Sequence, residues 1–360
     1  MSLRKGLAIF LFLSVAVCGA VLVSSIDRKS FDVFKDADTF KIYLAFMLVV
    51  GVWLLDAVKM CLLIRAAGEK ITFLTSMELT WINYFGAAIT PMQSGGGPLQ
   101  MYVMYQHGIS VGKSVAITII RTILIMLILG MMIPFAIMIK GDLPKMGWGV
   151  RGFVFYVVIF ILAIWLFLVV SIVRPTLVKR LAAWVITLLR RIGLLKAGWE
   201  ASLLKLAIRE IDTYNENVRA FLTTGRRYFL PGVFVAFVQI IFQLSVMPCM
   251  IWALGSKVSY PECVLIQAVF LFLLYFIPTP GGSGAAEGGA AFIFSMFVPW
   301  NVAGMLGIGW RFMTEYTGIF LGAIVAIRRI GWNLANQIMS SGGDAGRKDS
   351  DGKAPENGAD

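Results

Sequence analysis

The chain has 360 residues, of which 59% are hydrophobic and only 14% are charged, with a formal net charge of +12. Soluble domains contain about 45–50% apolar and about 25% charged residues, so the composition excludes a soluble globular protein and indicates one polytopic all-α membrane unit. The four cysteines lie singly and His107 is the one histidine, which excludes a disulfide framework and makes a metal or cofactor site unexpected.

Six apolar segments are long enough to cross a bilayer, which takes about 20 residues. In chain order they are Leu7–Ile26, Ile42–Ile64, Ser114–Ile139, Gly152–Val173, Tyr228–Leu254 and Val302–Ile327. The first can also be read as a signal peptide cleaved near Ala20, but its apolar run is longer than a usual signal core and favours a retained anchor.

Two further apolar stretches, Ile71–His107 and Pro261–Val298, are broken by glycine and proline. Each is either a re-entrant hairpin or a pair of short spans, and the Gly/Pro breaks favour re-entry, since irregular backbone at membrane depth needs cover from protein or water.

The distribution of positive charge predicts the topology. The loop Arg174–Arg227 carries eleven Lys and Arg, and such residues collect in cytoplasmic loops. We therefore expect both termini in the cytoplasm. Within this connector (174–227), Leu177–Leu195 reads as an amphipathic helix, either at the inner membrane interface or simply joining the halves. The tail 340–360 reads as disordered, which leaves a transmembrane domain over 1–339.

The two halves of the chain predict an inverted repeat. A span, a broken hairpin and a span fill about 42–139, and again about 228–327, with the first unit beginning outside and the second inside. At the breaks, Gly97-Pro-Leu-Gln100 aligns with Gly284-Ala-Ala-Glu287, and an arginine follows each glycine after 24 and 27 residues. Such repeats with broken helices indicate a transporter site near the midplane.

Ionisable residues inside the apolar segments are the candidate site residues, because burial in a membrane is costly. Arg121 and Arg311 are candidate phosphate ligands. Arg311 and Glu315 lie four residues apart, so an internal ion pair is the alternative for them. Asp56 and Lys59 are interpreted as a structural pair, and the role of Glu78 is left open.

The glycine runs suggest an anion site. Helix N-termini approached through glycine bind phosphate, and arginine adds bidentate recognition; close helix packing is the alternative. The substrate-binding residues predicted at the two breaks are Gly95, Gly96, Gly97, Gln100, Gly281, Gly282, Ser283, Gly284 and Glu287.

Three stretches carry a family resemblance: Pro91-Met-Gln-Ser-Gly-Gly-Gly-Pro-Leu-Gln-Met-Tyr102 with Gly108-Ile-Ser-Val-Gly-Lys-Ser-Val-Ala116, Phe276-Ile-Pro-Thr-Pro-Gly-Gly-Ser-Gly-Ala-Ala-Glu-Gly-Gly289, and Trp310-Arg-Phe-Met-Thr-Glu-Tyr316. From about Val49 to Ile330 the sequence resembles the transmembrane region of lysylphosphatidylglycerol synthases, which are flippase-like membrane proteins. The last stretch adds Tyr316 to the candidate site.

The resemblance implies transport of an anionic or aminoacylated phospholipid between leaflets of the cell membrane. No nucleic-acid partner is expected, because the sequence offers no soluble basic face apart from the connector. A membrane scaffold for a lipid-modifying or glycosyl-transferring enzyme is the alternative. The synthases carry a large soluble aminoacyl-transferase domain after the membrane region, whereas about thirty residues, most of them polar, follow Ile330 here. We therefore expect a protein that is not itself an enzyme.

Overall fold

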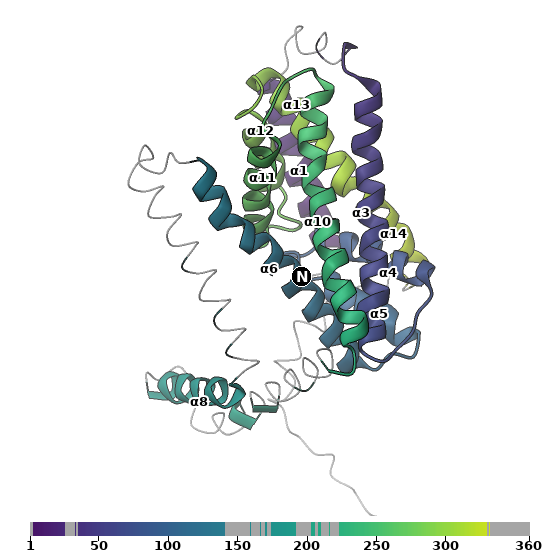
Figure 1. The fold of residues 1–360 in the computed structure, drawn as a ribbon, viewed down its shortest axis with the longest axis vertical. Coiled ribbons are helices and arrows are strands. Elements are labelled where there is room, and N and C mark those ends of the chain that lie inside the picture. Colours follow the sequence, from purple (N-terminus) through teal and green to yellow (C-terminus); the bar gives the residue numbers. More distant parts are fainter. Residues whose placement is uncertain are drawn as a thin grey trace, which may run out of the picture. The chain divides into compact units, whose positions relative to one another are not determined.

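The computed structural model describes residues 3–25, 35–140, 174–191 and 223–329, with single positions or short pieces at 33, 159, 166, 170, 203–205, 208–209, 216 and 331. Across these residues the regular secondary structure is helical and no strand is formed (Figure 1), which confirms the predicted all-α class. The chain divides into two compact units. Unit 1 is drawn from Met1–Ser30, Glu78–Val103 and Leu274–Asp360, and unit 2 from Phe31–Met77 and Met104–Leu273.

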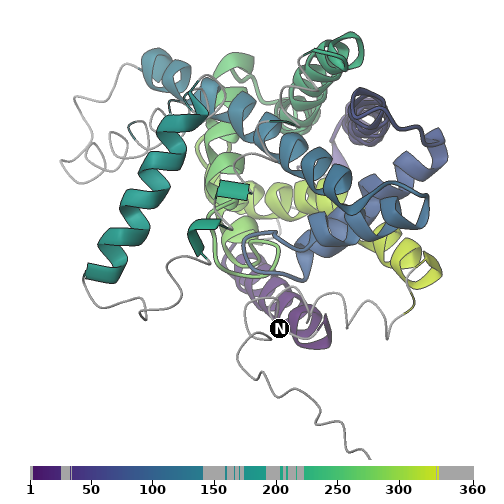
Figure 2. The ribbon, with the colours of Figure 1, turned by 90° about the horizontal axis from the view of Figure 1, so that it is seen from below.

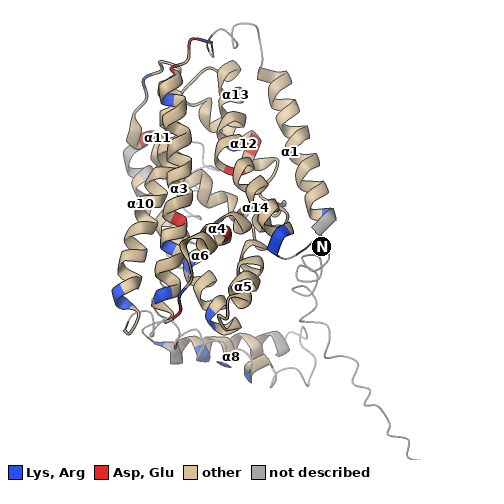
Figure 3. Cartoon of the chain, turned by 90° about the vertical axis from the view of Figure 1, so that its right-hand side faces the viewer, with Lys and Arg blue, Asp and Glu red and all other residues tan. Residues whose placement is uncertain are grey.

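Four helices are long and apolar enough to cross a membrane: α1 (Leu3–Ser25), α3 (Thr39–Ala66), α6 (Val111–Lys140) and α10 (Arg226–Ala253). They correspond to four of the six predicted spans. Figure 3 shows charged residues mainly near helix ends, with few along the lengths of the helices.

The other two predicted spans have different outcomes. Val302–Ile327 lies in three consecutive elements, α13 (Trp300–Arg311), the π-helix η2 (Phe312–Tyr316) and α14 (Thr317–Arg329). The chain is helical throughout, but the expected regular span contains a π-helical turn. The predicted span Gly152–Val173 lies, apart from single positions, outside the described residues.

In unit 2, α3 and α10 pack side by side and antiparallel (Figure 1). The N–H of Asp38, just before α3, donates to the carbonyl of Ala253 at the end of α10 at 2.7 Å. At the other end, Gly225 lies against the carbonyl of Ala66. The side chain of Asp38 caps α3, and hydrogen bonds from Lys41 hold the pKa of this exposed carboxyl below its usual value.

Each broken stretch forms two short helices. The first gives α4 (Phe73–Ala88) and α5 (Gly96–Gln106), and the second gives α11 (Tyr260–Leu274) and α12 (Ala285–Phe294). At 1.5 Å per residue the longest of these, α4, extends about 24 Å, which is short of the bilayer core of about 30 Å. The two helices of the first stretch run antiparallel, since the Gln100 amide donates to the carbonyl of Leu79 at 2.8 Å and Gly96 lies against Asn83.

Small residues bring α1, α12 and α13 together in unit 1 (Figures 1 and 2). Gly304 of α13 leaves room for Ser25 of α1, and a Cβ at Gly307 would lie 2.7 Å from the backbone nitrogen of Ala291 in α12. Helix α1 is therefore a packed part of this unit, and its loss by cleavage would expose α12 and α13.

Several helices of the first half of the chain have similar lengths to helices that follow in the same order in the second half. Helices α3 and α10 have 28 residues each, α4 and α11 have 16 and 15, and α5 and α12 have 11 and 10. The next element is α6 in the first half and α13–η2–α14 in the second.

The predicted amphipathic segment contains α8 (Pro175–Arg191). Leu177, Leu181, Trp184 and Leu188 recur at helical spacing and are exposed, so this helix presents an apolar face. The remainder of the connector, apart from short pieces, and the tail 340–360 lie outside the described residues.

Candidate functional site

The buried charged side chains of the described residues gather in two clusters, one in each unit. The α3 cluster, in unit 2, consists of Asp56 and Lys59 of α3, Arg121 of α6 and Gln239 of α10. The α12 cluster, in unit 1, consists of Ser14 of α1, Glu287 of α12, Arg311 of α13, and Glu315 and Tyr316 of η2.

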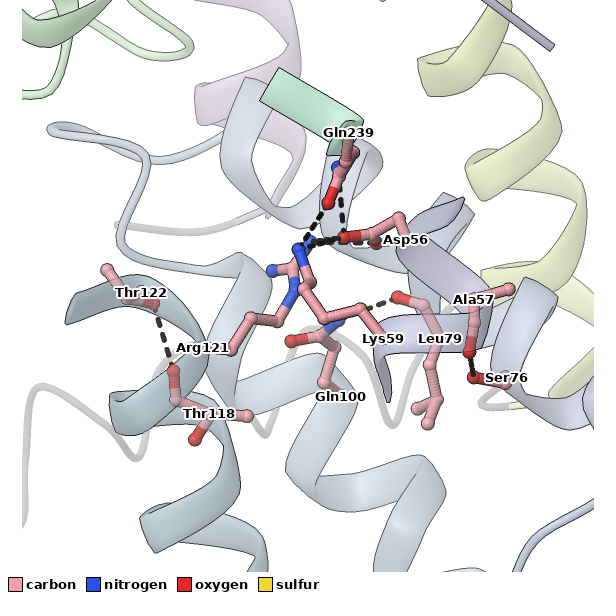
Figure 4. A network of polar contacts seen from close by, with 10 residues as sticks. All are labelled: Asp56, Ala57, Lys59, Ser76, Leu79, Gln100, Thr118, Arg121, Thr122 and Gln239. Carbon is pink, nitrogen blue, oxygen red and sulfur yellow. Dashed lines mark hydrogen bonds and ion pairs between the residues drawn. The ribbon is translucent and has the colours of Figure 1, made fainter. Parts of the chain in front are cut away.

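Asp56 is the centre of the α3 cluster (Figure 4). Lys59 Nζ lies 2.6 Å from Asp56 Oδ1, and Arg121 Nη2 lies 3.0 Å from Oδ2. The Gln239 amide donates to Asp56 Oδ1 at 3.2 Å, and its oxygen accepts from Lys59 Nζ at 2.6 Å. All four residues are buried, with Lys59 0% and Asp56 1% exposed.

Helical spacing explains how the sequence brings these groups together. Asp56 and Lys59 are three residues apart and share a face of α3. On α6, Ser114, Thr118 and Arg121 recur at intervals of four and three, and all three are buried. The cluster thus lies at the end of a polar stripe on an otherwise apolar helix.

The α3 cluster holds more positive than negative charge. Two cations share one carboxylate, and Arg121 Nε has no hydrogen-bond partner among the described residues. A buried charge needs a partner, and a guanidinium offers a fork of donors that matches phosphate or carboxylate oxygens. The cluster is therefore suited to hold an anion.

Glu287 is the centre of the α12 cluster and accepts three hydrogen bonds. The Ser14 and Tyr316 hydroxyls donate to Oε1 at 2.9 and 2.7 Å, and the Gly284 N–H donates to Oε2 at 2.6 Å. Arg311 lies between two carboxylates, with Nε 3.7 Å from Glu287 Oε1 and Nη1 3.7 Å from Glu315 Oε1. Its Nη2 donates to the carbonyl of Gly281 at 2.9 Å.

The carboxylate of Glu287 lies at the N-terminus of α12. A negative group is favoured there by the helix dipole and the free backbone N–H groups. The sequence predicted an exogenous anion at this end; in the structure the protein's own side chain caps it.

The π-helical turn explains why Arg311 and Tyr316 both reach Glu287. In an α-helix, residues five apart point about 140° away from each other. In a π-helix the hydrogen bond runs over five residues and the turn is wider, so Tyr316 comes closer to the face of Arg311. Such turns occur often at functional sites.

The two glycine breaks share the pattern T-P-x-x-S-G, over Thr90–Gly95 and Thr279–Gly284. Both x residues are left-handed: φ is 54° and 56° at Met92 and Gln93, and 60° and 67° at Gly281 and Gly282. The serine N–H donates to the proline carbonyl in each break, at 3.2 and 2.9 Å.

The breaks also contact each other within unit 1. Pro91 and Pro280 form an isolated antiparallel bridge, in which the Gly281 N–H donates to the carbonyl of Thr90 at 3.2 Å. Because α5 and α12 each begin directly after the shared pattern, Gly95 is the counterpart of Gly284. This corrects the alignment of Gly97 with Gly284 made from sequence.

The predicted site residues lie in both clusters and at the two breaks. Arg311, Glu287, Glu315 and Tyr316 lie together, next to Gly281 and Gly284, whereas Arg121 belongs to the α3 cluster. Gln100 donates to the backbone of α4, the Gly95 N–H donates to the Thr90 hydroxyl at 2.7 Å, and Gly96 packs on Asn83. A Cβ at Gly97 would meet nothing within 4 Å, and Gly282 packs near Leu274. The Ser283 hydroxyl is buried without a hydrogen-bond partner among the described residues.

Several cluster residues were not among the predicted site residues. Asp56 and Lys59 do pair, as the sequence predicted, but they pair around Arg121. Gln239, Ser14 and Cys18, whose sulfur lies 3.9 Å from the Tyr316 hydroxyl, were missed. Glu78 pairs with Arg329 at 2.9 Å in a partly exposed position.

Comparison with known proteins agrees with the resemblance and extends it toward the N-terminus. The family described as the lysylphosphatidylglycerol synthase TM region matches residues 6–322, which include α1 and both clusters. A UPF0104 membrane protein of Archaeoglobus fulgidus is 28% identical over 315 residues, covering 87% of this chain and 94% of that protein.

Proposed function

Because the chain belongs to the family of the lysylphosphatidylglycerol synthase transmembrane region, we propose that it moves a phosphate-bearing lipid, with or without an aminoacyl group, between the two leaflets of the membrane. The α3 cluster is the observation that carries this proposal. Its excess of buried positive charge and the unpartnered Nε of Arg121 suit the phosphate oxygens of a lipid headgroup.

The polar stripe on α6 supports the same function. A lipid headgroup crossing the bilayer needs polar contacts in place of water, because an unpaired polar group in an apolar medium costs several kcal/mol. Ser114 and Thr118 supply hydroxyls on the face that leads to Arg121, and the Ser114 hydroxyl is buried without a partner in the described structure.

We propose that the two halves form an inverted repeat with two re-entrant hairpins. The matching helix lengths, the antiparallel packing of α3 on α10, and the bridge between Pro91 and Pro280 support it. An antiparallel bridge between equivalent residues is the geometry expected at a pseudo-two-fold axis. Transporters with inverted repeats bind their substrate at such an interface.

We also propose that the chain is a multi-pass protein of the cell membrane with both termini in the cytoplasm. The positive charge of the connector supports this orientation. We further propose that the chain is a transport protein and not an aminoacyl transferase. In a host without aminoacylated lipids the expressed chain should produce none, and lysyl-phosphatidylglycerol made by the purified chain with charged tRNA would contradict this.

A vesicle assay tests the transport activity. The purified protein is reconstituted with fluorescent phosphatidylglycerol, lysyl-phosphatidylglycerol or phosphatidylcholine, and movement between leaflets is followed by quenching of the outer leaflet. Arg121→Lys keeps the charge and loses the fork, so it should lower the rate at least tenfold, a barrier change of about 1.4 kcal/mol. Arg329→Lys is the matched control, since Arg329 contacts Glu78 in the same way at the surface.

Two results would contradict the proposal. One is the absence of translocation of every phosphate-bearing lipid tested, which a scaffold for a lipid-modifying enzyme predicts. The other is an equal effect of the two arginine substitutions, which would remove the α3 cluster from the transport path. All three lipids carry a phosphodiester, so their relative rates separate a requirement for the aminoacyl group from a requirement for the net charge of the headgroup.

A further inference from the structure

The α12 cluster has the opposite charge balance to the α3 cluster. Glu287 and Glu315 share one arginine, Arg311, so a single negative charge is left over when both carboxyls are ionised. Two like charges that share one buried counter-charge resist joint ionisation, because the single cation cannot compensate both.

The two carboxyls of the cluster are not equivalent. Glu287 is fully buried and accepts hydrogen bonds from Ser14, Tyr316 and the backbone of Gly284, an arrangement that favours the ionised form. Glu315 accepts no hydrogen bond from the described residues that contact it, and its one ionic partner is Arg311 at 3.7 Å. The side chain of Glu315 is 23% exposed, against 3% for Arg311, so Glu315 is the member of this pair that reaches the protein surface.

The π-helical turn places Glu315 in this position. It lies in η2 between Arg311 and Tyr316, so a change in the charge of Glu315 acts on the turn that carries the Tyr316 hydroxyl to Glu287. Arg311 Nε has no hydrogen-bond partner among the described residues, and the guanidinium can therefore shift from one carboxylate toward the other.

We propose that Glu315 is a proton-binding site and that its protonation couples lipid translocation to a transmembrane proton gradient. The coupling rests on the transport function proposed above. A proton from one aqueous side adds to the Glu315 carboxylate and converts it to the neutral acid, which ends its attraction to Arg311. Arg311 then pairs with Glu287 alone. Loss of the proton to the other side restores the shared arrangement.

The titratable and charged groups around Glu315 come from the elements packed around η2 and the first turn of α14. They are Cys18 of α1, Glu287 of α12, Arg311 of α13, Tyr316 of η2, and Tyr84 of α4, whose ring packs on Gly318. Of these groups only Glu287 and Glu315 carry a carboxyl group, and three hydrogen-bond donors hold Glu287 in its ionised form. Glu315 is thus the group left to exchange a proton.

Infrared difference spectroscopy of the full chain in lipid vesicles tests proton binding without any substrate. A mild acidification from neutral pH, kept above about pH 5.5 so that exposed carboxyls stay ionised, should produce the carbonyl band of one protonated carboxylic acid. Glu315→Gln should remove that band. Glu78→Gln, which alters a partly exposed glutamate paired with an arginine, should leave it in place. A band that survives in Glu315→Gln, or no band in the unaltered protein, would overturn the proposed proton site.

The coupling is tested by translocation of fluorescent phosphatidylglycerol in vesicles with an imposed pH gradient. The unaltered protein should translocate several-fold faster or slower when the gradient is reversed, and Glu315→Gln should respond equally to both directions. Translocation that ignores the gradient in a protein with the infrared band would overturn the coupling and leave the transport function intact. If no lipid moves under any gradient, the transport function and the coupling both fail, whereas the infrared band still decides the proton site.

Discussion

Removing the negative charge of Asp56 should destabilise the protein more than removing the positive charge of Lys59. Asp56→Asn leaves Lys59 and Arg121 buried without a counter-charge, and breaking a buried pair in this way costs about 3–5 kcal/mol. Lys59→Met leaves Asp56 and Arg121 as a balanced pair. Lys59→Met loses the hydrogen bond to Gln239, and the unsatisfied acceptor lowers the free energy of unfolding by about 1–3 kcal/mol. Removal of a buried cation offsets part of this loss.

The double variant gives the sharper result. If charge balance governs the α3 cluster, adding Lys59→Met to Asp56→Asn removes one of the two uncompensated cations. The double variant should then melt at a higher temperature than Asp56→Asn alone, although it carries one more substitution. Melting is measured by tryptophan fluorescence of the protein in lipid nanodiscs.

The same helix provides the control. Asp38 and Lys41 of the exposed pair have the same spacing as Asp56 and Lys59, with side chains 42% and 41% exposed. Exposed pairs contribute about 0–1 kcal/mol, and Asn also caps helices, so Asp38→Asn with and without Lys41→Met should change the melting temperature little. A double variant at Asp56 and Lys59 that melts lower than Asp56→Asn would refute the charge-balance argument.

Three further predictions concern unit 1. Tyr316→Phe removes a hydrogen bond to a buried carboxylate, at about 1.5–3 kcal/mol, and should lower the melting temperature; an unchanged value would mean that Glu287 does not depend on this hydroxyl. Gly281→Met should impair folding, because a Cβ at this position would lie 2.9 Å from the Cα of Ala88. Gly282→Gln should still express, because a Cβ there meets only atoms 3.6 Å away or farther. Equal yields of the two variants would contradict the packing described. Single cysteines at Ser94 and Ser283 in a cysteine-free chain should be labelled from the cytoplasm and from outside respectively, and more slowly at the buried Ser283; labelling of both from one face would end the inverted-repeat proposal.

The long helices could be predicted because a bilayer sets their length. Runs of about 20 apolar residues leave few alternatives in a chain with this composition, and α1, α3, α6 and α10 lie where the apolar runs do. The two broken stretches were also predictable, since glycine and proline interrupt helices by removing a side chain or a backbone N–H.

The clusters could not be predicted, because they join residues that are distant in the sequence. Asp56 meets Arg121 and Gln239 from other helices, and no periodicity within one segment indicates which faces will meet. Ser14 is a small polar residue in an apolar helix and resembles many others that only bond to their own backbone. The π-helical turn has no distinct hydrophobic period, so Tyr316 was placed near the site by resemblance alone.

The repeat of the breaks was present in the sequence as T-P-x-x-S-G but was aligned on the wrong glycine. Met92 and Gln93 occupy left-handed positions that glycine fills in the second break. Residues other than glycine adopt this conformation rarely, so a pattern search that equates glycine with glycine shifts the register by two residues. The backbone, rather than the residue type, identifies the equivalent positions.

The opposite charge of the two clusters has a consequence for the energetics of transport. Phosphatidylglycerol carries about one negative charge, so its movement together with one proton transfers no net charge, and the membrane potential then does no work on the cycle. Movement of the lipid and the proton in opposite directions transfers two charges, worth about 4.6 kcal/mol at 100 mV from 2.3 kcal/mol for each charge. A potassium diffusion potential imposed on the vesicles at equal pH separates these cases. An unchanged rate for phosphatidylglycerol indicates joint movement, and a rate that changes steeply with the potential indicates exchange. If the translocation rate of Glu315→Gln depends on the potential differently from the rate of the unaltered protein, the proton at Glu315 contributes to the charge that moves. If the dependence is unchanged, another group carries that charge.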